Sequence, residues 1–163
     1  MIIESSNINH VMVARAASKD ETRYFMMGIH VEGGKMIATD GRRLHWADCP
    51  YDDGEYQIVK STKYRMSMVL NEQFDGQYPN WERVIPDGCD NPMEVNLTKD
   101  KESYGIATII RLLPDEVMFQ LDYLKDIYGF VWNVSVCGEK NNILRFDDEE
   151  DTRHAVIACM DNR

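Results

Sequence analysis

Hydrophobic and polar residues alternate over several short stretches in the first part of the chain, and one helical pattern interrupts them. Ile8, Val11 and Met12 recur at helical spacing, which predicts a helix over residues 8–17. Alternation predicts strands over residues 1–3, 23–31, 35–39, 42–48 and 55–60. Gly33-Gly34 marks a hairpin turn after the second of these strands. Residues 35–39 and 42–48 are expected to form one strand with a bulge or kink at Asp40-Gly41, so the predicted order is β-α-β-β-β.

The last part of the chain repeats this order. A strand is predicted over residues 117–120, and a helix follows over residues 121–128, where Gly129 ends it through a left-handed conformation. Three further strands are expected, over residues 131–136, 143–146 and 154–160. The repeat predicts an α+β fold of two β-α-β-β-β units, with curved antiparallel sheets and two helices on one side.

The segment between the two repeats has a weaker pattern. Strands are expected over residues 64–71 and 93–97, and a helix over residues 104–113 that Pro114 closes. We expect a single domain over residues 1–163. Its parts are a first half over about residues 1–62, a connecting segment over about 63–116 and a second half over about 117–160. The sequence assigns no role to residues 87–116.

Composition and charge narrow the classes of protein. The 163 residues carry 18 Lys and Arg against 28 Asp and Glu, a net charge of −10, which argues against a broad nucleic-acid-binding surface. The 44% of hydrophobic residues suits a packed core, and no apolar run is long enough for a membrane helix. No secretory signal is visible, so we expect a cytoplasmic protein with no membrane partner and with reduced thiols at Cys49, Cys89, Cys137 and Cys159.

No arrangement of residues indicates catalysis or a metal. The four histidines, His10, His30, His45 and His154, lack ligand spacing, and the acidic run over residues 147–151 fits a solvated hairpin turn better than a cation loop. No phosphate-binding glycine loop or nucleophile motif is present. We therefore expect no enzyme activity, no catalytic residues, no metal site and no cofactor.

Two short strings carry the strongest functional signal. Residues 38–44 read Ala-Thr-Asp-Gly-Arg-Arg-Leu, where Asp-Gly permits a positive φ and a sharp bend within the strand. Residues 78–86 read Tyr-Pro-Asn-Trp-Glu-Arg-Val-Ile-Pro, where the two prolines predict a rigid, extended segment. Each string places arginine beside an apolar residue, as a groove for an extended peptide requires. The alternative is one hairpin turn and one connecting loop with solvated arginines.

Both strings resemble signatures of the bacterial sliding clamp, the β subunit of DNA polymerase III. The first is similar to that family's Ala-Thr-Asp-Gly-His-Arg-Leu strand, with Arg42 in place of histidine, and the second to its Phe-Pro-Asp-Tyr-Arg-Arg-Val-Leu-Pro segment. The strand at residues 23–28, the junction at residues 119–124 and the closing strand at residues 154–160 also resemble the family. The chain resembles a single clamp domain built from two distant halves of a longer clamp.

The resemblance implies a clamp-like protein of DNA replication that binds short partner peptides in a groove. By position, the groove residues are Met26, Thr39, Gly41, Arg42, Arg43, Leu44, Pro79, Arg83, Val84, Tyr123, Val156, Ala158 and Met160. Apolar anchors would lie between Leu44, Val84 and Val156, while Arg43 and Arg83 hold polar groups. Ala158 and Cys159 depart from the Met-Pro pattern of the family, which leaves the depth of the groove open.

The implied partners are a DNA polymerase or a clamp loader, reached through a short peptide. Contact with duplex DNA has weak support, from Arg15, Lys19 and Tyr24 only, because the predicted helices carry few basic residues. Two alternatives stay open. One is a processivity factor in which several copies form a homo-oligomeric ring around DNA, and the other is a regulatory decoy that competes with a host clamp.

Overall fold

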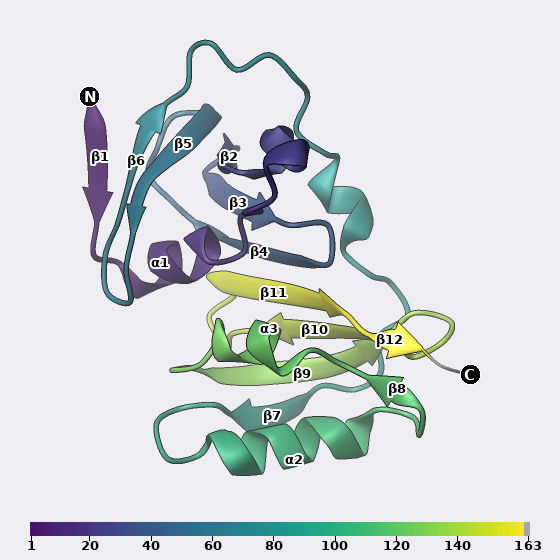
Figure 1. The fold of residues 1–163 in the computed structure, drawn as a ribbon. Coiled ribbons are helices and arrows are strands. Elements are labelled where there is room, and N and C mark those ends of the chain that lie inside the picture. Colours follow the sequence, from purple (N-terminus) through teal and green to yellow (C-terminus); the bar gives the residue numbers. More distant parts are fainter. Residues whose placement is uncertain (162–163) are drawn as a thin grey trace. The chain divides into compact units, whose positions relative to one another are not determined.

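The computed structural model describes residues 1–161, and these divide into two compact units with a boundary between Glu82 and Arg83 (Figure 1). Each unit carries its own antiparallel strands and its own buried side chains. The boundary lies inside the predicted connecting segment. We describe the two units separately.

The first unit is a curved antiparallel sheet in the order β1-β6-β5-β2-β3-β4, with one α-helix. Its elements are β1 (Ile2–Ser5), α1 (Ile8–Ala14), the 3-10 helix η1 (Glu21–Met26), β2 (Ile29–Glu32), β3 (Lys35–Thr39), β4 (Arg43–Asp48), β5 (Gly54–Ser61) and β6 (Met66–Leu70). A second 3-10 helix, η2 (Trp81–Val84), spans the boundary between the units.

Helix α1 covers one face of this sheet, against β3 and β4. It begins after Asn7, whose side chain accepts a 2.9 Å hydrogen bond from the backbone N–H of Asn9. Its residues from His10 to Ala14 are buried, and the Nδ1 atom of His45 on β4 lies 2.8 Å from the carbonyl oxygen of Met12. Complete burial lowers the pKa of His45 to about 3, so this ring stays neutral at ordinary pH.

The second unit has four antiparallel strands in the order β11-β10-β9-β7 and a small two-stranded pair, β8 with β12. Its elements are β7 (Met93–Asn96), α2 (Glu102–Leu112), β8 (Val117–Met118), α3 (Leu121–Lys125), β9 (Val131–Cys137), β10 (Ile143–Asp147), β11 (Arg153–Ala158) and β12 (Met160–Asp161). Helix α2 runs along β7 (Figure 1). The prediction of an α+β fold with antiparallel sheets is confirmed, with α2 as an additional helix from the connecting segment.

Aromatic side chains organise the core of the second unit. Trp132 contacts Phe130 and Phe146 edge to face, with ring centroids 5.5 and 5.9 Å away. Its indole N–H donates a 3.0 Å hydrogen bond to the carbonyl oxygen of Ile127, which holds the turn after α3 against β9. The guanidinium of Arg153 lies 4.2 Å from the centroid of the Phe130 ring, so a cation also covers this cluster.

Three local predictions are wrong. Residues 23–26 belong to η1 rather than to a strand, because the carboxylate of Asp20 accepts from the backbone N–H of Thr22 and starts a helical turn. The predicted helices over residues 8–17 and 121–128 end earlier, at Ala14 and Lys125, and short turns follow them. The second string is not extended throughout, because η2 coils its centre. Alternation alone does not separate a strand from a tight helical turn.

The prediction of four reduced thiols is also wrong, because Cys89 and Cys137 form a disulfide within the second unit. Cys137 is buried at the end of β9 and Cys89 is exposed, while the backbone N–H of Asp90 donates a 3.0 Å hydrogen bond to the carbonyl oxygen of Val136. The disulfide therefore holds the start of the unit against β9. A separation of 48 residues gives no motif from which the pairing follows. Cys49 and Cys159 are free and half-buried.

Replacing Gly105 with alanine will destabilise the protein. Alanine normally favours a helix over glycine by about 1 kcal/mol, but a Cβ at this position of α2 would lie 2.6 Å from the carbonyl oxygen of Asn96 and 2.6 Å from Leu97 Cδ2. We expect the free energy of unfolding to fall by about 1–3 kcal/mol, because overpacking moves α2 away from β7. Urea unfolding measures the change.

The exposed Ser103→Ala on the same helix is the matched control, and it should leave the free energy of unfolding equal or slightly higher. A Gly105→Ala variant as stable as the wild type would contradict the close approach of α2 to β7.

Candidate functional site

The first string forms a tight hairpin turn between β3 and β4, in which Thr39 pairs with Leu44. The Thr39 hydroxyl donates a 2.6 Å hydrogen bond to the carbonyl oxygen of Arg43 and accepts a 3.1 Å bond from the N–H of Gly41. Gly41 has φ +90°, and an added Cβ would lie 2.7 Å from the guanidinium of Arg23. The Asp-Gly step thus reverses the chain instead of bending one strand as predicted. The backbone of the first string is therefore a hairpin turn, as the alternative to a peptide groove expects for this string.

Asp40 and Arg43 connect this turn to helix α1. The carboxylate of Asp40 accepts from the backbone N–H groups of Arg42 and Arg43, at 2.9 and 3.2 Å, and from Arg43 Nε at 3.2 Å. The other side of the Arg43 guanidinium donates a 2.9 Å bond to the carbonyl oxygen of Arg15 at the end of α1. The Arg43 side chain is only 9% exposed. It therefore supports the turn, while the neighbouring Arg42 is exposed to solvent.

The second string packs on the face of the first unit that carries His30, Ile37 and Trp46, which are register partners across β2, β3 and β4. The ring of Tyr78 stacks on His30 at 4.7 Å with an interplanar angle of 7°. Trp81 approaches Trp46 at 6.0 Å, and both are buried. Tyr78 and Trp81 are therefore part of the core of the first unit, so these two aromatic positions are structural.

A cluster of ionisable side chains surrounds His30. Its Nδ1 atom lies 2.5 Å from a carboxylate oxygen of Glu55, and its Nε2 atom lies 3.4 Å from Glu32. The indole N–H of Trp81 donates a 3.2 Å bond to the same oxygen of Glu32. Burial alone would lower the pKa of His30, but the hydrogen bonds and charges of the two glutamates together outweigh burial and raise it. A cavity of about 480 Å³ beside this cluster is lined mostly by polar and aromatic residues.

The predicted groove residues fall in both units and differ in exposure. In the first unit, Met26, Thr39 and Leu44 are buried around the β3–β4 turn, whereas Gly41 and Arg42 are exposed. In the second unit, Val156 is buried in β11. The remaining members are the exposed Arg83, Val84, Ala158 and Met160 and the half-buried Arg43, Pro79 and Tyr123. Met26 and Gly41 are neighbours, since a Cβ on Gly41 would lie 3.7 Å from Met26 Cε. A groove that combines both sets stays a prediction.

The residues predicted to contact DNA differ in their contacts. Arg15 donates a 3.0 Å hydrogen bond to the carbonyl oxygen of Lys63, which gives it a structural role at the β5–β6 turn. Lys19 is exposed after the end of α1. Tyr24 is 58% exposed, packs edge to face on Phe25 and donates a 3.1 Å bond to the carbonyl oxygen of Asp75. Their role in DNA binding stays a prediction.

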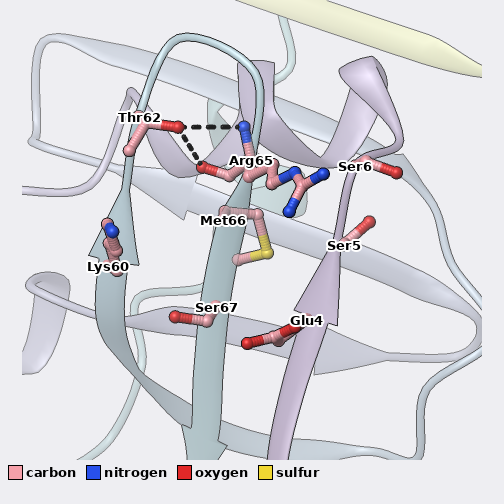
Figure 2. A pocket seen from close by; sticks show the side chains of 8 residues that line it. All are labelled: Glu4, Ser5, Ser6, Lys60, Thr62, Arg65, Met66 and Ser67. Atoms are coloured by element: carbon pink, nitrogen blue, oxygen red, sulfur yellow. Dashed lines mark hydrogen bonds between the residues drawn. The ribbon is translucent and has the colours of Figure 1, made fainter.

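Sequence reasoning missed a polar groove at the β5–β6 hairpin. Glu4, Ser5, Ser6, Lys60, Thr62, Arg65, Met66 and Ser67 line a cavity of about 410 Å³ at the end of β1, β5 and β6 (Figure 2). The sequence feature that indicates this groove is the basic run Lys-Ser-Thr-Lys-Tyr-Arg over residues 60–65, in an otherwise acidic chain. The strands predicted over residues 55–60 and 64–71 do not by themselves show that this run lies beside Glu4 and Ser5 of β1.

The acidic run forms the turn between β10 and β11, as expected. Asp148 is buried rather than solvated, and its carboxylate accepts from the backbone N–H groups of Thr152 and Arg153 at 2.6 and 3.1 Å. Within residues 1–161, no three His, Cys, Asp or Glu side chains gather as metal ligands. Among the same residues, no helix has the length and apolar character that spanning a membrane requires.

No protein-family model matches the chain, and no curated protein matches it. Its fold is similar to that of solved bacterial sliding clamps. With the DNA polymerase III β subunit of Pseudomonas aeruginosa, the TM-score is 0.62 at 16% identity, over 98% of this chain and 66% of that one. With the sliding clamp of Bacillus subtilis, the TM-score is 0.60 at 16% identity, over 100% of this chain and 65% of that one. With the DNA polymerase III β subunit of Thermotoga maritima, the TM-score is 0.63 at 12% identity, over 100% of this chain and 66% of that one.

These similarities establish a clamp-type fold, as the two strings predicted. The matches span just under two thirds of the length of those clamps.

The cluster around His30 makes stability depend on pH. Because the folded-state pKa of His30 is raised above 6.5, its stabilising contribution is complete below pH 6.5 and is lost as pH rises through the folded-state pKa. We expect the difference in free energy of unfolding between wild type and His30→Gln to be larger at about pH 6 than at about pH 9. Urea unfolding at both pH values measures it.

The comparison with His30→Gln is necessary because His45 acts in the opposite direction. Its lowered pKa removes stability as pH falls below 6.5, in both proteins alike. If the difference in free energy of unfolding between wild type and His30→Gln is constant with pH, or grows as pH rises, the glutamates do not hold a proton on His30.

Proposed function

We propose that this chain acts in DNA replication as a non-enzymatic, clamp-like protein that binds short extended partner peptides. The observation that carries the proposal is the clamp-type fold, in which the string at residues 38–44 forms a rigid turn held by Asp40 and Arg43. A rigid turn with an exposed arginine suits peptide recognition, because no ordering cost is added on binding. The expected partners are a DNA polymerase or a clamp loader.

The surroundings of each residue refine its proposed role. Since Arg43 is bonded to Asp40 and Arg15, we assign the polar contacts with a peptide to the exposed Arg42 and Arg83. Val84, 54% exposed, and Met160, 48% exposed, are the apolar side chains available to anchor residues.

A titration with a labelled peptide tests this function. The full chain is added to a fluorescent clamp-binding peptide with apolar anchor residues, and anisotropy is recorded. We expect a Kd below about 100 μM, equivalent to about 5.5 kcal/mol of binding free energy. Griselimycin, which is bound in a clamp structure from Bartonella birtlesii, serves as the competitor. Val84→Asp should weaken binding at least about tenfold, because it places an unpaired carboxylate against apolar side chains.

Val59→Asp on β5 is the matched control, since Val59 is 53% exposed and lies outside the proposed groove. It should bind the peptide as the wild type does. The proposal fails if the peptide does not bind at hundreds of micromolar, or if both substitutions weaken binding equally.

A ring-forming processivity factor is the second candidate, and two open strand edges favour it. Among residues 1–161, β1 pairs only with β6 and β7 only with β9, so each leaves one row of backbone groups available to another copy. If copies assemble, light scattering will give a mass that rises with concentration to several multiples of 18.9 kDa. A constant mass of one chain would exclude the ring.

A further inference from the structure

The β5–β6 hairpin is basic within an acidic protein. Residues 56–71 contain Lys60, Lys63 and Arg65 and no Asp or Glu, although the whole chain carries a net charge of −10. All three side chains are exposed. Such a local reversal of charge indicates an anionic partner.

The tip of the hairpin is a rigid turn. The hydroxyl of Thr62 donates a 3.1 Å hydrogen bond to the carbonyl oxygen of Arg65 and accepts a 3.1 Å bond from the N–H of the same residue (Figure 2). The N–H of Thr62 donates to that carbonyl at 2.8 Å. Arg15 adds a fourth bond, from its guanidinium to the carbonyl oxygen of Lys63. The basic side chains therefore extend from a backbone that is already ordered.

One face of the hairpin presents cations and hydroxyl groups to the cavity of about 410 Å³. A register shift between Ile58 and Lys60 places Lys60 opposite Ser67, which in turn pairs with Glu4 of β1. The guanidinium of Arg65 extends above Met66 toward Ser5 and Ser6 (Figure 2). Glu4 is the one carboxylate of this lining, which limits its net charge to +1 and leaves Lys60 and Arg65 for contacts with phosphate.

The two cations of the cavity have no anionic partner of their own. Within residues 1–161, no carboxylate forms an ion pair with Lys60 or Arg65. Tyr64, between the basic residues, is 66% exposed, and Lys63 Nζ lies 5.3 Å from its ring centroid. Nucleobases stack on exposed aromatic rings of this kind.

We propose that the β5–β6 hairpin binds single-stranded nucleic acid, with Lys60 and Arg65 contacting backbone phosphate and Tyr64 stacking on an unpaired base. Single strands are favoured over duplex because paired bases do not expose their faces to a side chain. An acidic peptide would use the cations but not the ring. The proposal requires no peptide groove, and it differs from DNA contact through Arg15, Lys19 and Tyr24, since Arg15 here orders the turn.

The test is anisotropy of a labelled oligothymidylate of about 20 nucleotides, longer than the roughly 4–16 nucleotides of a typical single-strand site. The full chain is titrated over a range of salt concentrations. Lys60→Ala/Arg65→Ala should weaken binding and reduce the slope of log K against log salt by about 1.4, which is the loss of two phosphate contacts. Tyr64→Ala should weaken binding of the oligothymidylate but not of an abasic strand of equal length.

Lys99→Ala/Lys101→Ala is the matched control, because it removes two exposed cations from the segment before α2. It should retain wild-type affinity, and circular dichroism should show all variants folded. The proposal is overturned if this control weakens binding as much as the hairpin variant. It is also overturned if polyglutamate competes as well as the oligonucleotide, or if a duplex binds equally and Tyr64→Ala has no effect.

Discussion

The ion pair between Asp40 and Arg43 is the interaction on which the architecture of the first unit depends. It closes the β3–β4 turn, and the same guanidinium reaches the end of α1 through the carbonyl oxygen of Arg15. Arg15 then donates to the carbonyl oxygen of Lys63, so one chain of contacts joins two hairpin turns and a helix. Because Arg43 is largely shielded from water, its bonds are stronger than those of an exposed pair.

Structural elements cover both faces of the sheet in the first unit. Helix α1 covers one face, and the second string covers the other through Tyr78 and Trp81. The string therefore belongs to the core at its start and reaches the boundary of the unit at its end. What remains for partners are the turn, the exposed Arg42 and the basic hairpin. The proposed peptide and nucleic-acid contacts thus use different residues on the same unit.

Much of the fold was predictable because alternation and turn chemistry act locally. The strands at residues 35–39, 131–136 and 143–146 were found within a residue or two, and so was the helix near residues 104–113. Residues 23–26 were misassigned because a side-chain cap at Asp20 outweighs their alternation. The candidate site was predictable as motifs, but not the roles of its arginines, since Arg42 and Arg43 are adjacent and only their contacts distinguish them.

By itself, the sequence determined the α+β class, the positive φ at Gly41 and the likeness to clamps, since these depend on period, glycine chemistry and short strings. Tertiary structure alone decided that Arg43 supports a helix, that Cys89 joins Cys137 and that His30 lies between two glutamates. It also decided that Lys60, Ser67 and Glu4 share one row of a sheet. The physical reason is separation along the chain. Pairing between strands brings together residues that are far apart in the sequence and follow no repeating spacing. No local sequence pattern can therefore predict that they are in contact.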